Sequence, residues 1–94
     1  AAPSHCKTGH FRIIGTFGGT FHYVQWRDNS ANEDGVTVEH WWRNQSGTWV
    51  LNWSVNREAN STGVGLAGKP GPNDKFRVKA FNASGDSAWS NWAH

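Results

Sequence analysis

Two glycine-containing segments are candidates for phosphate or nucleophile chemistry. Residues 63–69 (GVGLAGK) satisfy a G-x-G-x-x-G pattern and nearly a phosphate-cradling G-x-x-x-x-G-K. A phosphate loop needs a helix directly after it, and Pro70-Gly71-Pro72 forbids one. Gly85-Asp86-Ser87 is similar to a nucleophilic serine turn, but Ala88 follows it and the chain has no G-x-S-x-G elbow. We therefore expect both segments to be turns.

Histidine, cysteine and carboxylate side chains could supply a general base or metal ligands. The chain has five His, and Asp28 or Asp86 could orient one of them, but no spacing in the sequence brings them together. His5, Cys6 and His10 cluster near the N-terminus without the paired spacing of a structural zinc site. The sequence therefore predicts no catalytic residue, no metal site, no cofactor and no enzyme.

Basic side chains alternate along one segment near the C-terminus. Lys75, Arg77 and Lys79 occupy every second position, with aromatic residues close in the chain. A nucleic-acid surface usually carries a clustered basic field, whereas this chain has 9 Lys and Arg against 7 Asp and Glu. A guanidinium over an indole face contributes about 0.5–2 kcal/mol, so we expect Arg77 to stack on Trp89 or Trp92. No nucleic-acid partner is expected.

Length and composition indicate one small domain over residues 1–94. No stretch approaches the roughly 18 consecutive apolar residues of a membrane span, and the mean hydropathy is −0.70, so no membrane insertion is expected. Seven Trp, five Phe and one Tyr supply much of the core volume. The chain lacks Met and begins Ala1-Ala2-Pro3, which we interpret as a processed, secreted, extracellular product.

The pattern of the chain predicts an all-β fold. No window carries a convincing 3.6-residue apolar period, and Gly, Asn, Ser and Pro punctuate the chain about every ten residues. Seven strands predict an antiparallel sandwich. The predicted strands are His10 to Ile14, Thr20 to Arg27, Val36 to Trp42, Thr48 to Val55, Ser61 to Leu66, Lys75 to Asn82 and Ala88 to Trp92.

Two runs carry a family resemblance. Residues 24–39 (VQWRDNSANEDGVTVE), with a core Trp26, resemble the second and third strands of a fibronectin type III domain, and residues 76–92 (FRVKAFNASGDSAWSNW) resemble its sixth and seventh. The resemblance implies a seven-stranded immunoglobulin-like sandwich without catalytic residues. Asp74 stands where the family has a tyrosine corner, and residues 89–93 (WSNWA) are similar to the tryptophan-serine box of cytokine-receptor domains.

Strand alternation predicts which rings leave the core. Trp41 and Trp42 are adjacent, so one must face outward unless a bulge intervenes, and we expect Trp42 inside and Trp41 outside. Trp89 and Trp92 are three apart, so a regular strand would place them on opposite faces. On the sixth strand Phe76, Val78 and Ala80 are expected inside, and Arg77, Lys79 and Phe81 outside. The orientation of Trp49, Leu51 and Trp53, which share one face of a regular strand, is left open.

Cys6 and the N-glycosylation sequons support the extracellular interpretation. Cys6 is the only cysteine, so it is either a buried thiol or the site of an intermolecular disulfide in a homodimer. Asn44, Asn52, Asn60 and Asn82 each begin an N-x-S/T acceptor motif.

These observations favour a secreted, non-catalytic, lectin-like recognition module. Its ligand would be a glycan or a cell-surface protein, because Trp and Arg suit both the apolar faces of sugars and protein interfaces. The alternatives are a protein-interaction or immunomodulatory effector that acts as a dimer, and an accessory domain of a larger secreted hydrolase. The expected ligand-binding residues are Trp41, Arg77, Lys79, Phe81, Trp89 and Trp92.

Overall fold

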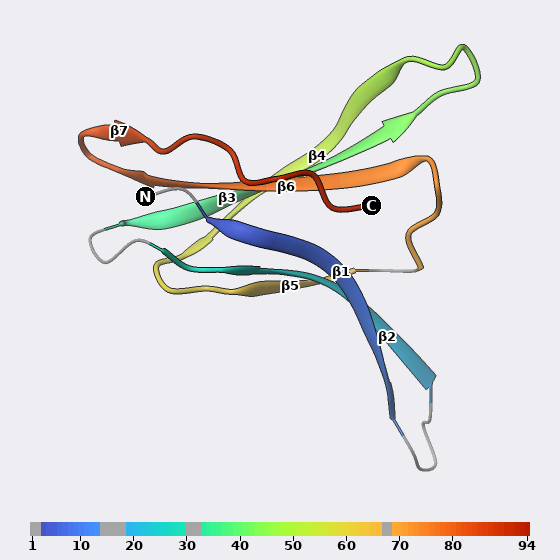
Figure 1. The fold of residues 1–94 in the computed structure, drawn as a ribbon, viewed down its shortest axis with the longest axis horizontal. Helices are drawn as coiled ribbons and strands as arrows, with labels where there is room; N and C mark the ends of the chain where they lie inside the picture. The colour runs from blue at the N-terminus through green and yellow to red at the C-terminus, as the bar shows by residue number, and fades with distance from the viewer. Residues whose placement is uncertain (1–2, 14–18, 30–32, 67–68) are drawn as a thin grey trace.

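The computed structural model describes residues 3–13, 19–29, 33–66 and 69–94 (Figure 1), and the side chains of residues 10–21 lie outside this description. Within the described ranges every regular element is a strand, and no helix is long and apolar enough to cross a membrane. The strands are β1 (Ser4–Ile13), β2 (Gly19–Arg27), β3 (Gly35–Arg43), β4 (Trp49–Glu58), β5 (Gly63–Leu66), β6 (Asp74–Asn82) and β7 (Gly85–Asp86).

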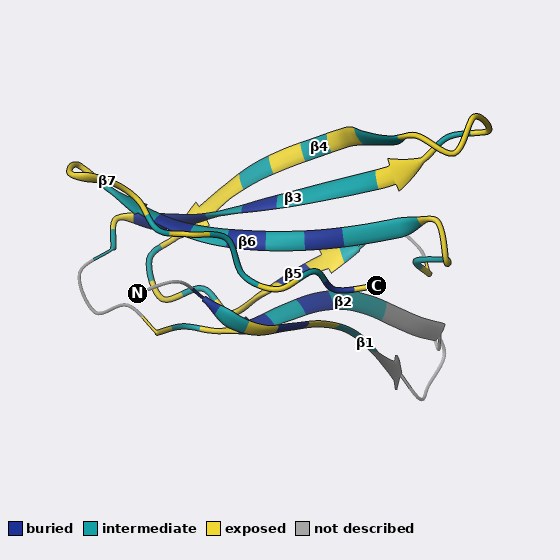
Figure 2. Cartoon of the chain, turned by 45° about the horizontal axis from the view of Figure 1, so that its top comes forward, coloured by how far each residue is buried: buried dark blue, intermediate teal, exposed yellow. Residues whose placement is uncertain are grey.

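The strands form two antiparallel sheets that lie one over the other (Figure 2). One sheet has the order β1-β2-β5, and the other has the order β4-β3-β6-β7. The chain therefore crosses between the sheets after β2, after β4 and after β5. These findings confirm the predicted all-β sandwich with seven strands.

The core lies between the two sheets and is built from alternate positions of each strand. Val24 and Trp26 of β2 face Val36 and Val38 of β3, because successive side chains on a strand point to opposite faces. The expected inward register of β6 is confirmed, since Phe76, Val78 and Ala80 are all buried. The other buried residues are Cys6, Val64 and Ala93.

Two predicted strands and one predicted turn differ from the structure. The prediction of a turn over residues 63–69 is wrong for its first four residues, because Gly63–Leu66 pair with β2 as β5. The first strand begins at Ser4 rather than His10, and the side chain of His10 lies outside the described residues. The predicted strand Ala88 to Trp92 is wrong, because β7 consists of Gly85–Asp86 alone and the chain then continues without regular strand geometry.

Residues 87–93 run alongside β6 and form hydrogen bonds with it at every third residue. The backbone N–H groups of Ser87 and Ser90 donate to the carbonyls of Ala80 and Val78 at 2.8 and 2.7 Å. Their hydroxyl oxygens accept from the N–H groups of the same two β6 residues at 2.9 and 3.0 Å. Ala93 completes the series by exchanging two backbone hydrogen bonds of 2.8 Å with Phe76. A period of three is the repeat of polyproline II, and it returns every third side chain to the same side.

This C-terminal segment also closes one side of the sandwich. The Asn91 side chain accepts from the backbone N–H of Cys6 at 3.0 Å and donates to its carbonyl at 2.9 Å. The Thr8 hydroxyl donates to the His94 carbonyl at 2.9 Å. Residues 87–94 therefore connect β6 of one sheet to β1 of the other.

A bulge in β4 determines where its two tryptophans point. His40 pairs with Trp53 and Trp41 pairs with Leu51, so Asn52 is an extra residue between them. The extra residue reverses the alternation. Trp53 consequently packs on the core, while Trp49 lies on the outer face with Trp41.

Trp42 is directed inward as expected but is 44% exposed. It follows Val36, Val38 and His40 on the inner face of β3, but it lies close to the end of that strand. Leu51 of β4, which pairs with Trp41 on the other face of the sheet, is 46% exposed. The two large apolar side chains that are exposed in the described chain therefore lie on opposite faces of the β3–β4 hairpin.

Asp74, the first residue of β6, makes two hydrogen-bond contacts through its carboxylate. Its Oδ2 accepts from the backbone N–H of Gly71 at 2.7 Å, and its Oδ1 lies 2.8 Å from His40 Nε2. The carboxylate therefore connects the turn before β6 to the inner face of β3.

Candidate functional site

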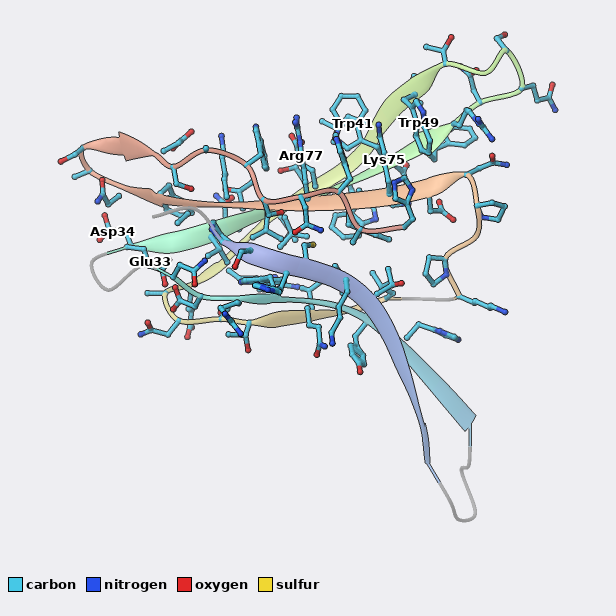
Figure 3. All side chains as sticks on the ribbon, in the orientation of Figure 1. Glu33, Asp34, Trp41, Trp49, Lys75 and Arg77 are labelled. Atoms are coloured by element: carbon cyan, nitrogen blue, oxygen red, sulfur yellow. The ribbon has the colours of Figure 1, made fainter. Side chains whose placement is uncertain are left out.

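Four indoles and three cations form a ladder on the outer face of the four-stranded sheet, and Figure 3 labels several of them. Lys75, Arg77 and Lys79 project outward from alternate positions of β6. We define the ladder as Trp49, Lys75, Trp92, Arg77, Trp89 and Lys79, in their order along the sheet, with Trp41 beside Arg77.

Rings and cations alternate along the ladder. Trp92 has the Lys75 ammonium 4.0 Å and the Arg77 guanidinium 4.7 Å from its ring centroid. Trp89 has the Arg77 guanidinium at 4.0 Å and the Lys79 ammonium at 4.7 Å. Residues two apart on a strand are about 6.8 Å apart, which is enough for one ring between two cationic side chains. The faces of both indoles are therefore covered by cations.

Glu39 fixes Arg77 and Trp41 together. Its Oε1 accepts from Arg77 Nε at 2.8 Å and from Trp41 Nε1 at 2.9 Å. The Trp41 ring meets the edge of Trp92 at a centroid distance of 6.2 Å, the favoured T-shaped geometry for aromatic pairs. The middle of the ladder is therefore held by hydrogen bonds as well as by stacking.

The two ends of the ladder differ in charge. At one end Lys79 Nζ donates to Asp86 Oδ2 at 2.6 Å. At the other end Lys75 lies 4.2 Å from the Trp49 centroid, and Arg43 donates to the Asn73 side-chain oxygen at 2.8 Å. Among the described residues neither of these two cations has a carboxylate partner. The Trp49 end is therefore the electropositive end.

The structure brings together five of the six residues that the sequence singled out. Trp41, Arg77, Lys79, Trp89 and Trp92 lie in or beside the ladder. The expectation that Trp89 and Trp92 lie on opposite faces is wrong. The three-residue repeat places both indole rings on the same side, where each contacts the Arg77 guanidinium.

Phe81 lies away from the ladder. It is directed outward, as expected, but its ring covers Gly35, the residue with which it pairs on β3. A Cβ on Gly35 would lie 2.7 Å from that ring, so the glycine makes room for it.

Sequence reasoning missed Trp49 and Lys75 as ladder members. Lys75 shares the alternation of Arg77 and Lys79, so the signal for it was visible in the sequence. Trp49 depends on the bulge at Asn52, and nothing in the sequence marks that bulge.

A His40–Asp74 pair was also missed, since the sequence suggested Asp28 or Asp86 as the orienting carboxylate. The His40 ring stacks on Phe76 at a centroid distance of 4.8 Å, and its Nε2 lies 2.8 Å from Asp74 Oδ1. Its Nδ1 lies 3.1 Å from the Asn52 side-chain nitrogen. Both ring nitrogens thus have a partner within the fold, and the His40–Asp74 contact links β3 to β6.

Cys6 is a core residue with 4% exposure. Burial raises the pKa of its thiol to about 11, although a hydrogen bond with Ser90 acts in the opposite direction. Burial favours the buried thiol over the intermolecular disulfide, because a partner's cysteine has no access to a sulfur in the core.

We expect Cys6 to resist a thiol reagent such as dithionitrobenzoate at pH 8 in the folded protein and to react at once in denaturant. Unfolding lowers the pKa of the thiol from about 11 to its ordinary value of 9.0. Between these values the unfolded chain binds fewer protons than the folded chain, so stability falls as the pH rises through this window. The Cys6→Ala variant should lose that component of the pH dependence. Rapid modification of the folded protein would contradict the prediction.

The four sequon asparagines differ in how free their side chains are. Asn44 Oδ1 accepts from the N–H groups of Ser46 and Thr48 in the β3–β4 turn. Asn82 Oδ1 accepts from Ser84 N–H, and the Asn52 amide nitrogen contacts His40. Asn60 is exposed in the turn after β4.

We expect Asn60 to be the preferred glycan acceptor in a eukaryotic secretory host, because attachment to Asn52 would disturb its contact with His40. Intact-mass measurement before and after glycosidase treatment, with Asn60→Gln and Asn52→Gln variants, tests this. The prediction requires that Asn60→Gln removes most of the glycan mass and that Asn52→Gln removes little.

Glu33 lies before β3 and is labelled in Figure 3. Its Oε1 accepts from Asn60 N–H at 3.1 Å, while its Oε2 is buried and has no hydrogen-bond partner among the residues that the structure describes. Burial raises the pKa of this carboxyl, and the neighbouring Asp28 raises it further.

Because the folded chain holds the Glu33 proton more tightly than the unfolded chain, this group lowers stability as the pH rises through its folded pKa. We expect Glu33→Gln to increase the unfolding midpoint in urea at pH 7 and to have less effect near pH 4. A lower midpoint at pH 7 would contradict this assignment.

No model of a known protein family matches the chain, and a search of curated proteins finds no match. The site is therefore interpreted from its own geometry.

Proposed function

We propose that the protein is a non-catalytic, secreted recognition module with fibronectin type III-like topology. The resemblance places the third and sixth strands in one sheet, and β3 and β6 are neighbours in one sheet here. A further support is the run of residues 87–93 along β6, whose two indoles enclose Arg77 as a tryptophan-serine box implies. The finer topology and the extracellular location are part of this proposal.

The observation that carries the proposed function is the alternation of rings and cations in the ladder. Stacking and the Glu39 contacts fix the side chains before any ligand arrives, so binding would cost little conformational entropy. Because cations cover the faces of Trp89 and Trp92, a ligand meets indole edges and positive charge. These features suit a protein partner with acidic and apolar groups, since Trp and Arg are favoured interface anchors.

A glycan is the second candidate ligand. Trp49 and Trp41 are the indoles that favour a glycan. Each of these rings contacts one cationic side chain of β6, whereas Trp89 and Trp92 each lie between two of them. A sugar would stack against these rings beside their cations, and an anionic sugar would also meet Lys75 and Arg43, which lie 4.2 and 5.6 Å from the Trp49 centroid.

A paired binding screen tests the proposed function. The folded domain, multimerised to increase avidity, is applied to an array of cell-surface and secreted protein ectodomains and to a glycan array. We expect binding to a protein that weakens at least tenfold in Trp41→Ala and persists in Trp42→Ala. Trp42 is the matched control, because it is adjacent, 44% exposed and directed to the other face.

Circular dichroism establishes that both variants fold. Binding to glycans alone, with the same dependence on Trp41, would show that the ligand is a glycan and not a protein. No binding on either array, or equal loss in the two variants, would contradict a recognition role for the ladder.

A further inference from the structure

We propose that the free edge of β5 accepts an extended segment of a partner polypeptide as an added strand. This edge belongs to the three-stranded sheet and is distinct from the ladder. On the opposite side of the sandwich, residues 87–94 connect the two sheets. On the side where β4 and β5 are the edge strands, two hollows are lined by residues of both strands.

The register shows which backbone groups point to the free edge. Residues of β2 and β5 pair so that Val24 lies opposite Val64 and His22 opposite Leu66, and Trp26 N–H donates to Thr62 O at 3.0 Å in the same register. Hydrogen-bonded pairs alternate in an antiparallel ladder, so Val64 and Leu66 bond to β2. The N–H and C=O groups of Gly63 and Gly65 therefore point away from the sheet.

The two glycines leave this edge uncovered. A Cβ on Gly65 would meet nothing within 4 Å, and one on Gly63 would approach only to 3.5 Å of Val24 O. The outer face of β5 is therefore open above both glycines, so side chains of an added strand would meet no side chain of these two residues there. In this part of the chain, no hydrogen bond from the outward groups of these glycines to another described backbone group is found.

Hollows lie on both sides of β5. On its outer face a hollow of about 530 Å³ is lined by Tyr23, Gln25 and the backbone of the two glycines. On its inner side a hollow of about 270 Å³ lies between β4 and β5, with Trp53, Val55 and Val64 in its walls. Side chains of an added strand would alternate between the two faces, so successive residues would enter successive hollows.

The walls indicate the chemistry of the segment. The inner hollow is apolar apart from Ser54 and Arg57. A neighbouring hollow of about 420 Å³ shares Trp53 and Gly65 with it and is also lined by Lys69 and Asp74, whose carboxylate is already bonded to Gly71 N–H and His40. Within the described chain neither Arg57 nor Lys69 has an ion-pair partner. The segment that fits carries an apolar residue for the inner hollow and a carboxylate near these cations.

A small molecule would fill one hollow and leave the outward glycine groups unbonded, whereas an extended peptide satisfies both features. A second copy of the chain would have to present an edge of its own. The short β5 offers four residues for such pairing, and its own hollows would stay empty, so a separate peptide is the occupant we propose.

A phage-displayed library of random 12-residue peptides is the probe, with the immobilised full chain as target. The test variant is Gly65→Pro, which removes the outward N–H and leaves the bonds of Val64 and Leu66 to β2 in place. The matched control is Gly65→Ala, which adds a Cβ in open space and keeps the N–H. Thermal unfolding of both variants verifies the fold.

We expect enriched peptides with an acidic residue and alternating apolar residues. Synthetic copies should bind wild type and Gly65→Ala similarly and Gly65→Pro about tenfold more weakly, since one hydrogen bond is lost and its acceptor is left unpaired. Amide hydrogen exchange at Gly63 and Gly65 should slow when peptide binds.

Three results would overturn the proposal: no enrichment over phage without an insert, equal binding to Gly65→Pro, or unchanged exchange at the two glycines. A concentration-dependent dimer in sedimentation that dissociates in Gly65→Pro would assign the edge to a second copy and also overturn it. Trp41→Ala should leave peptide binding unchanged, which separates this site from the ladder.

Discussion

Replacing Arg77 by methionine is expected to lower the free energy of unfolding by about 2–4 kcal/mol. The guanidinium contacts three indoles, with centroid distances of 4.0 Å to Trp89, 4.7 Å to Trp92 and 5.6 Å to Trp41. Each such contact contributes about 0.5–1 kcal/mol. The variant also leaves the half-buried Glu39 carboxylate without its cation, which adds a desolvation cost.

Thermal unfolding followed by far-ultraviolet circular dichroism measures this effect. For a domain of this size a loss of 1 kcal/mol lowers Tm by about 4–8 °C, so we expect a decrease of about 10 °C or more. Arg77→Lys, which keeps a cation but loses the planar stacking group, should lose less. Lys69→Met is the control for removal of an exposed cation and should change Tm little. An Arg77→Met variant as stable as wild type would show that the ladder does not stabilise the fold.

Replacing Phe76 by alanine is expected to destabilise the protein by about 3–5 kcal/mol. Its side chain is 2% exposed and lies under both His40 and Trp53, at centroid distances of 4.8 and 6.3 Å. Truncation would leave a cavity beneath these rings and remove the surface on which His40 stacks. Equilibrium unfolding in urea gives the change directly.

Phe81→Ala is the matched control for this change. Phe81 is on the same strand, but its ring lies on the outer face over Gly35 and remains half-buried. We therefore expect a loss well below that of Phe76→Ala. Equal losses in the two variants would contradict the assignment of the core to the inner face of β6.

Together these experiments examine the two faces of β6 separately. Phe76, Val78 and Ala80 hold its inner face to the core, and Lys75, Arg77 and Lys79 present the ladder on its outer face. A recognition surface on a strand anchored in this way is positioned by the core rather than by a loop. Loss of the core contact at Phe76 should therefore also weaken binding through the ladder.

The sequence alone determined the all-β class and the register of β6. Both depend on local alternation, in which Phe76, Val78 and Ala80 separate Lys75, Arg77 and Lys79, and a period of two places them on opposite faces in any sheet. The same alternation placed Trp41 outward. The expected cation–π contact of Arg77 with Trp89 or Trp92 is confirmed, because it involves residues that are close along the chain and lie on neighbouring segments.

Tertiary structure decided the remaining features, because each depends on pairing between distant segments. The extra residue Asn52 arises only where β4 meets β3, and it sends Trp49 to the ladder and Trp53 to the core. Trp89 and Trp92 share a face because Ser87 and Ser90 bond to β6 at every third residue, a spacing that strand alternation does not contain. The His40–Asp74 pair and the open edge of β5 likewise follow from which strands become neighbours, and neighbours in space are not encoded by periodicity within one strand.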